Sequence, residues 1–175
     1  MKILTYPSAE LRKRAAPVTK EMKESPEFKS KLTEMVEIAK QDGIGLAASQ
    51  VGWHVNLFLV LVNRNLEKIE PQVIINPQIV QQSKQMVKAE EGCLSVPGFK
   101  APVSRPQEIS WTWENLEGEH FEATERFTED PDGFYIRVIQ HESDHLAGVL
   151  FIDRLTAVNR MKFESWHKNK DKPNQ

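Results

Sequence analysis

The chain has 175 residues, of which 39% are hydrophobic and 27% are charged, and its formal net charge at pH 7 is -2. This composition is ordinary for a folded globular domain and excludes a wholly disordered or fibrous chain. No apolar run approaches the roughly 20 residues that a membrane-spanning helix needs. The weak negative charge gives no electrostatic reason to expect a nucleic-acid partner.

Cys93 is the single cysteine of the sequence, so no internal disulfide can form. The N-terminal residues Met1 to Pro7 contain neither the apolar core of a signal peptide nor the Arg/Ser-rich character of a transit peptide. We therefore expect a protein of the reducing cytoplasm. A processed organelle protein would show the same features, so that alternative stays open.

The first regular element in chain order is an amphipathic helix over 26–40. Ser25 followed by Pro26 is typical of an N-cap with proline in the first turn, and apolar residues recur at helical spacing after it. Asp42-Gly43 ends this helix. Residues 43–52 are small and rich in glycine and alanine, which favours close backbone packing over a regular element.

Strand-like runs dominate the middle of the chain. They are predicted at 56–62, 72–80 and 86–90. Two further runs, 108–113 and 120–127, are predicted to pair as a hairpin across Asn115 to Gly118.

The C-terminal part is predicted to be helical. A helix of about fifteen residues follows Pro131-Asp132-Gly133 and ends at Gly148, and a last helix spans 156–166. Residues 167–175 are polar and lysine-rich, which predicts a frayed tail. Because no linker interrupts these elements, we expect a single α+β catalytic domain over 1–175 with mainly antiparallel strands.

The sharpest chemical signal lies inside the penultimate helix and reads His141-Glu142-Ser143-Asp144-His145. Two histidines four residues apart project from one helical face and can share a metal ion, with Glu142 close enough to reach a water at that metal. The alternative is a structural helix whose two half-buried histidines are satisfied by other groups.

Two histidines leave a metal under-coordinated, so a third ligand is needed. The metzincin pattern is matched by Gly148, but Phe151 stands where that pattern has its third histidine. Glu164 lies where gluzincins carry a glutamate, but no motif supports it. Cys93 is the remaining candidate, although a lone cysteine is more often an inert buried residue.

Three separated segments together resemble the peptide deformylase family. They are Gly43-Ile44-Gly45-Leu46-Ala47-Ala48-Ser49-Gln50, Glu91-Gly92-Cys93-Leu94-Ser95 and Gln140-His141-Glu142-Ser143-Asp144-His145-Leu146. Tyr6-Pro7, Ile75-Asn76-Pro77 and Leu150 to Asp153 are also similar to family segments, so the resemblance covers nearly the whole chain. It implies an α+β fold whose antiparallel sheets pack around a central helix carrying the His-Glu-x-x-His motif.

The resemblance implies a hydrolase that removes the formyl group from the N-terminal formyl-methionine of newly made polypeptides. Cys93, His141 and His145 would bind one divalent metal and leave a fourth position for water, as catalytic sites do. The metal would lower the pKa of that water, and Glu142 would act as general base and then general acid. The resemblance implies Fe²⁺ in the cell, with Zn²⁺, Ni²⁺ or Co²⁺ as substitutes.

The resemblance also implies an oxyanion site and a peptide groove. The Gln50 side-chain amide and the Leu94 backbone N–H would stabilise the oxyanion together with the metal. The substrate would bind as an added strand along Gly45, where a Cβ would intrude. The residues expected to contact it are Ile44, Gly45, Gly92, Phe134 and Val138. The segment Phe134-Tyr135-Ile136 is bulkier than the small and aliphatic residues we associate with the family there. Lys100 falls where many members carry an arginine.

The expected partners are N-formylmethionyl nascent peptides, with a transient ribosome contact and without nucleic acid or membrane, and the expected state is a monomer. Two other functions stay open on the sequence, namely a zincin-type metalloprotease and a non-catalytic binder of metal or formyl peptide. Asp144 is predicted to pair with Arg105, the alternative being a solvated aspartate.

Overall fold

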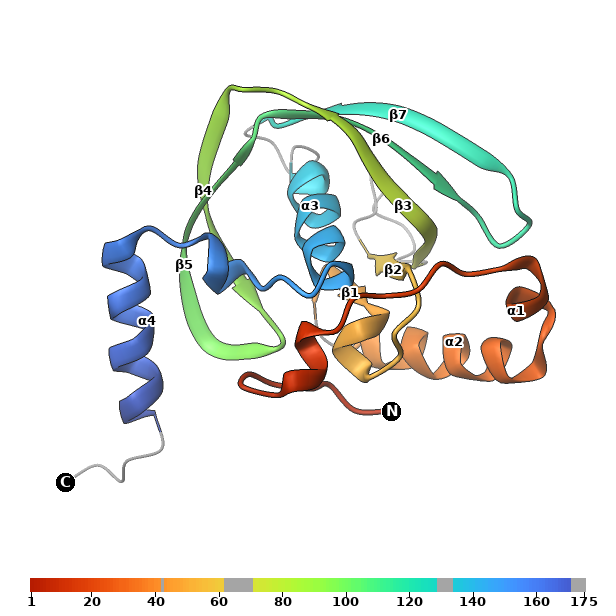
Figure 1. Cartoon of the computed structure of the whole chain (residues 1–175), viewed down its shortest axis with the longest axis horizontal. Helices are drawn as coiled ribbons and strands as arrows, with labels where there is room; N and C mark the ends of the chain where they lie inside the picture. Colours follow the sequence, from red (N-terminus) through yellow and green to blue (C-terminus); the bar gives the residue numbers. More distant parts are fainter. Residues whose placement is uncertain (42, 62–70, 129–133, 171–175) are drawn as a thin grey trace.

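The computed structural model describes residues 1–41, 43–61, 71–128 and 134–170. Two antiparallel sheets surround the helix α3 (Tyr135–Leu146), as Figure 1 shows. The larger sheet has the order β1-β2-β3-β6-β7, and the smaller sheet consists of β4 and β5. Over the described residues, no helix is both long and apolar enough to cross a membrane.

The elements have the following bounds. The strands of the larger sheet are β1 (Gly45–Ala47), β2 (Leu57–Val60), β3 (Gln72–Gln82), β6 (Glu108–Glu114) and β7 (His120–Arg126), and those of the smaller sheet are β4 (Met86–Cys93) and β5 (Val96–Pro106). The other α-helices are α1 (Lys20–Glu24), α2 (Pro26–Ala39) and α4 (Ala157–Asn169). Within the described part of the chain, the 3-10 turns are η1 (Ala9–Arg12), η2 (Ala48–Val51) and η4 (Phe151–Arg154).

Most of the predicted elements are confirmed. The helix over 26–40 is α2, and the Ser25 hydroxyl accepts from the Phe28 N–H at 3.1 Å while Pro26 stands in the first turn. The predicted hairpin is β6–β7, with Trp111 opposite Ala123. The runs 56–62, 72–80 and 86–90 correspond to β2, β3 and β4, although residue 62 lies outside the described residues.

The prediction for 43–52 is wrong, because this segment contains β1 and η2. β1 is stabilised by antiparallel pairing with β2, where Leu46 lies opposite Leu59. β5 was not predicted at all, since Pro97, Pro102 and Pro106 interrupt it. Proline is tolerated at a sheet edge, and β5 is paired to β4 alone in the two-stranded sheet.

The C-terminal helices differ from prediction at their ends. Residues 131–133 lie outside the described residues, and α3 has 12 residues rather than about fifteen. The last helix continues to Asn169, so the prediction of a frayed tail is wrong for residues 167–169. The His167 ring stacks on Phe163 with centroids 5.8 Å apart, which extends the packed part of the helix. Residues 171–175 of that tail lie outside the described residues.

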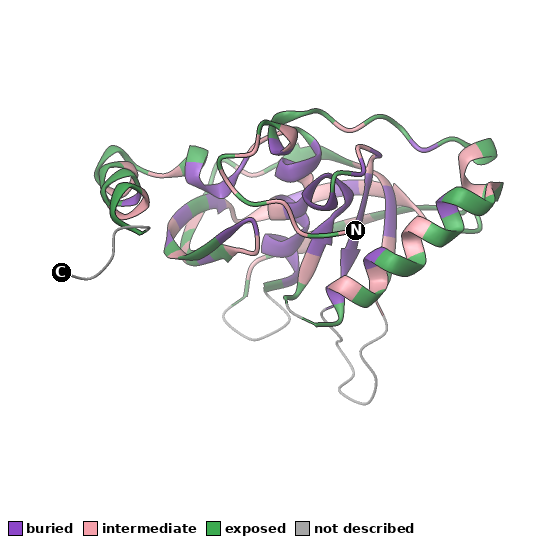
Figure 2. Ribbon diagram, turned by 90° about the horizontal axis from the view of Figure 1, so that it is seen from below, coloured by how far each residue is buried: buried purple, intermediate pink, exposed green. Residues whose placement is uncertain are grey.

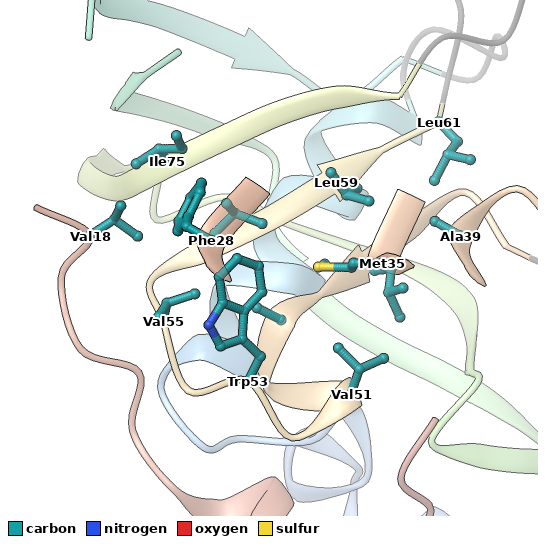
Figure 3. Close-up of a cluster of buried hydrophobic side chains, with 13 residues drawn as sticks. Val18, Phe28, Met35, Ala39, Val51, Trp53, Val55, Leu59, Leu61 and Ile75 are labelled. Atoms are coloured by element: carbon teal, nitrogen blue, oxygen red, sulfur yellow. The ribbon is translucent and has the colours of Figure 1, made fainter. Parts of the chain in front are cut away.

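The core places α2 and α3 on opposite faces of the larger sheet. Alternate residues of a strand face opposite sides, and Leu57 and Leu59 of β2 belong to the cluster on the α2 side. Figure 3 shows Leu59 there with Phe28, Met35 and Trp53. The intervening residues of β2 join the cluster that contains the apolar face of α3. A third cluster connects β5 and η4 to α4. Burial therefore concentrates around α3, whereas α4 is exposed along most of its length (Figure 2). The predicted central helix is confirmed.

Candidate metal centre

The polar motif of α3 lies on a helix that is buried on nearly every side. Ile136, Ile139 and Leu146 pack into the cluster against the larger sheet. The opposite face carries His141 and His145, one turn apart, with ring centroids separated by 4.9 Å. Because α3 is anchored through its apolar face, its two histidines are held toward the smaller sheet.

Cys93 ends β4, at an irregularity in its register with β5, and meets the two histidines. Its Sγ lies 3.2 Å from His145 Nε2. One ligand atom from each of Cys93, His141 and His145 falls within 4.8 Å of the others, and over the described residues this is the group found with metal-binding geometry. A thiolate and two imidazoles suit Zn²⁺ or Fe²⁺, and three protein ligands leave a coordination position open.

Glu91 contacts the Nδ1 side of His141, the first histidine of the motif. Its Oε2 lies 3.1 Å from His141 Nδ1, which leaves Nε2 of that ring for a metal. Arg105 and Arg137 donate to the same carboxylate at 2.6 Å each. Burial alone would raise the pKa of Glu91, but the hydrogen bonds from Arg105 and His141 outweigh it and hold that pKa well below its usual range.

Glu142 brings a buried carboxyl group to the site. Its Oε2 is buried and has no hydrogen-bond partner among the described residues, and burial raises the pKa of Glu142 to about 7. A Cβ added to Gly45 would lie 2.6 Å from Glu142 Oε1 and 2.7 Å from Val138 Cγ1. The space that glycine leaves at position 45 is therefore filled by the glutamate, and not only kept for a substrate. A carboxyl group with a pKa near neutrality can both accept and donate a proton.

Gln50 lies in η2 with its amide orientation fixed. Its Oε1 accepts from the Ala47 N–H at 2.8 Å, so its Nε2 must point the other way. That nitrogen lies 3.2 Å from Ser95 Oγ and 3.5 Å from Cys93 Sγ. Leu94 follows Cys93, and its side chain lies beside Gly43. Gln50 thus presents N–H donors next to the cysteine.

A cavity of about 770 Å³ opens onto these groups. Its lining includes all five residues predicted to contact substrate, Ile44, Gly45, Gly92, Phe134 and Val138, together with Gln50, Cys93, Leu94, His141 and Glu142. Ile44 and Phe134 are exposed large hydrophobic side chains, and Lys100 lines the same cavity. His145 is buried and does not reach the lining.

Sequence reasoning missed several residues of the site. Phe99 and Gly98 line the cavity from β5, a strand that no local pattern indicated. Glu91 and Ser95 belong to the Cys93 segment, so their position in that motif was the signal that could have assigned them a role. Arg137 had no such signal, since its partner Glu91 is 46 residues away in sequence.

Phe151 and Glu164 occupy the third-ligand positions of the two metalloprotease patterns, and neither belongs to the group formed by Cys93, His141 and His145. The Phe151 ring stacks on His141 with centroids 6.2 Å apart. Glu164 is paired with Arg160 at 3.3 Å on the exposed side of α4. The predicted pair of Asp144 and Arg105 is present, with Nη1 2.8 Å from Oδ2, and Asp144 is buried rather than solvated.

Comparison with known proteins gives one consistent result. The family model described as polypeptide deformylase matches residues 1–161. "Peptide deformylase 2" of Xanthomonas campestris pv. campestris is 41% identical over 159 residues, which cover 90% of this chain and 88% of that one. "Peptide deformylase" of Teredinibacter turnerae is 37% identical over 173 residues, 96% of each chain.

The similar solved structures are also peptide deformylases. Peptide deformylase from Ehrlichia chaffeensis in complex with actinonin has a TM-score of 0.80 and 31% identity, covering 99% of this chain and 98% of that one. The Met-Ala-Ser-bound class I type b peptide deformylase from Acinetobacter baumannii has a TM-score of 0.75 and 30% identity, covering 89% and 98%.

Proposed function

The chain belongs to the peptide deformylase family, whose hydrolases remove the formyl group from nascent polypeptides, and we propose that Cys93, His141 and His145 form its metal centre. The observation that carries this proposal is the convergence of one cysteine sulfur and two imidazoles beside Glu142, whose buried Oε2 has no hydrogen-bond partner among the described residues. One cavity reaches all of these groups except the buried His145. We propose Fe²⁺ as the metal in the cell, with Zn²⁺, Ni²⁺ or Co²⁺ as substitutes, because this donor set suits each of them.

When bound at these three ligands, a divalent metal supplies a Lewis acid that lowers the pKa of water and polarises the formyl oxygen. The protein residues then determine where protons go. Glu142 accepts the proton of the attacking water at its unpartnered Oε2 and delivers it to the leaving nitrogen. Burial raises the pKa of Glu142. The carboxyl group can therefore both accept and release a proton near neutral pH, as the two transfers require.

Gln50 and Leu94 stabilise the negative charge on the former formyl oxygen. The Gln50 Nε2 is oriented by the Ala47 N–H and lies beside Cys93, so it donates without reorganising. The Leu94 backbone N–H is proposed as the second donor because Leu94 directly follows the metal ligand and lines the cavity.

The cavity fits the methionine side chain and the peptide that follows it. Val138, Phe134 and Ile44 supply apolar contact for the methionine, and Gly45 and Gly92 line the path of the peptide backbone. Phe134 narrows the apolar part relative to a small or aliphatic residue. Lys100 places a positive charge in the same cavity, which favours peptides without basic residues after the methionine.

We further propose that the chain acts as a single catalytic domain over 1–175 and as a monomer in the cytoplasm, on nascent chains emerging from the ribosome. The supporting observations are that buried clusters cover both faces of the larger sheet and that the described residues contain no helix long and apolar enough to span a membrane. A transient ribosome contact is consistent with the exposed, basic surface of α4, which carries Lys162 and Lys168.

The test is formate release from formyl-Met-Ala-Ser by protein prepared without oxygen and loaded with Fe²⁺ or Ni²⁺. Acetyl-Met-Ala-Ser and unformylated Met-Ala-Ser serve as matched controls. We expect release from the formyl peptide alone. Folded, metal-loaded protein that releases no formate would leave only a binder of formyl peptides. Cleavage within the unformylated peptide would instead indicate a metalloprotease.

A further inference from the structure

The turn η4 contacts α3 through a half-exposed arginine. Arg154 Nε lies 2.5 Å from Asp144 Oδ2, and Arg154 Nη2 lies 2.5 Å from Asp144 Oδ1. The Asp144 side chain is 10% exposed, whereas that of Arg154 is 44% exposed. Arg154 therefore reaches from the surface to an acid that lies between the two histidines of the motif.

From Asp144 a continuous chain of charged hydrogen bonds leads to His141. Arg105 Nη1 donates to Asp144 Oδ2 at 2.8 Å. The same guanidinium donates to both oxygens of Glu91, at 2.6 and 2.9 Å. Glu91 Oε2 in turn lies 3.1 Å from His141 Nδ1. Each link is within hydrogen-bond distance. The orientation of the His141 ring therefore depends on how well Asp144, at the other end of the chain of hydrogen bonds, is fixed in place.

Arg154 fixes Asp144 through its two hydrogen bonds. The Arg105 guanidinium is 2% exposed and is fixed between two carboxylates, Glu91 on one side and Asp144 on the other. Without Arg154, Asp144 would keep a single arginine partner and could turn about its side-chain bonds. Arg105 would then lose a fixed anchor in a buried environment, where an imperfectly paired charge is costly.

The same turn touches His141 directly. The Phe151 ring, 1% exposed, stacks on the His141 imidazole at 6.2 Å between centroids and 28° between planes. On another side it meets Phe99 at 6.4 Å. Phe151 thus limits rotation of the imidazole from the ring face, while Arg154 acts through the charged chain on Nδ1.

We propose that η4 is a brace for the metal centre, in which Arg154 and Phe151 are positioning residues that fix the imidazole of His141. The inference rests on the proposed function, because it takes His141 as a metal ligand. It assigns a role to a turn outside the three motifs and to the phenylalanine that stands where a metalloprotease would carry its third histidine.

The test uses the full chain loaded with Co²⁺, whose visible absorption with a thiolate ligand reports both occupancy and geometry. Release of Co²⁺ to excess EDTA is followed in wild type and in Arg154→Gln. Loss of an outer partner of a metal ligand costs about 10–100-fold in metal affinity. Because Arg154 acts through three intervening side chains, we expect release to be about tenfold faster, with an altered Co²⁺ spectrum.

Arg160→Gln is the matched control. Arg160 donates to the Ile152 carbonyl of the same turn at 3.0 Å, and its hydrogen bonds do not include Asp144. We expect wild-type release and spectrum in this variant. An equal acceleration in both variants would show that docking of η4 in general, and not the link to Asp144, is responsible, and would overturn the proposed role of Arg154.

Two further variants keep the test decisive. Arg154→Lys retains the charge without the paired contact and should release Co²⁺ at an intermediate rate, even if Arg154→Gln fails to fold. Phe151→Leu should accelerate release while the charged chain is intact. Wild-type protein without thiolate–Co²⁺ absorption would refute the ligand assignment, and the brace with it. Normal wild-type binding with unchanged release in Arg154→Lys and Phe151→Leu would refute the brace alone.

Discussion

Gly45→Ala tests the arrangement of the site most directly. The added Cβ would lie 2.6 Å from Glu142 Oε1 and 2.7 Å from Val138 Cγ1. To restore an ordinary contact of 3.4 Å, the carboxylate must retreat by roughly 0.8 Å. Neither neighbour can give way freely, because Glu142 and Val138 are both buried on α3.

The expected consequence is a loss of turnover. A misplacement of about 1 Å costs roughly 100-fold in rate, which corresponds to about 2.7 kcal/mol of transition-state stabilisation. Overpacking of this kind also costs about 1–3 kcal/mol in the free energy of unfolding. We therefore expect kcat for formyl-Met-Ala-Ser to fall about 100-fold while the metal content stays stoichiometric.

The assay measures kcat, KM, metal content and thermal unfolding of Gly45→Ala beside Gly92→Ala. A Cβ at Gly92 would meet Lys100 Cγ at 3.1 Å, and this flexible, exposed side chain can move away. Because Gly92 lines the proposed peptide path but does not contact Glu142, the comparison variant should raise KM and change kcat much less than Gly45→Ala does. Near-normal kcat in Gly45→Ala would refute the argument that the missing Cβ makes room for Glu142, and a rise in KM alone would assign Gly45 to peptide binding instead.

Four further predictions address the metal, the base, a turn and an ion pair. Cys93→Ser should weaken Co²⁺ or Zn²⁺ binding at least tenfold, and unchanged affinity in equilibrium dialysis would remove Cys93 from the ligand set. Glu142→Gln should retain stoichiometric metal but lose about 100-fold or more in kcat, and activity close to wild type would show that another group is the base. Gly148→Ala should lower the free energy of unfolding by about 2–4 kcal/mol and reduce the melting temperature, since Gly148 has φ +76° and its Cβ would clash with the Arg12 carbonyl oxygen; equal melting temperatures would contradict this. Partial burial would raise the pKa of Asp153, but hydrogen bonding from Arg12 outweighs it and holds that pKa below its ordinary 3.8. The ion pair therefore stabilises the fold above pH 3.8 and is lost as pH falls through the lowered pKa. Asp153→Asn should cost about 1 kcal/mol at pH 7 and progressively less in acid, and a cost independent of pH in urea unfolding would contradict the assignment.

The sequence by itself determined the chemistry of this protein and its local elements. A helix cap at Ser25 and Pro26 acts within one turn, so α2 could be predicted almost to the residue. The spacing of His141 and His145 likewise places both imidazoles on one helical face wherever that helix lies. The identity of Cys93 as the third candidate followed from its motif, and the structure brings its Sγ to 3.2 Å from His145.

Only the tertiary structure decided what depends on residues far apart in the chain. β5 is a strand because β4 pairs with it, against the preference of its three prolines. Residues 167–169 are helical because His167 packs on Phe163. Glu91 receives a role because the fold brings His141, 50 residues away in sequence, to its carboxylate. Only the fold shows that Glu142 occupies the space beside Gly45. A local pattern reports conformational preference, whereas the space around a side chain is set by elements that meet only after folding.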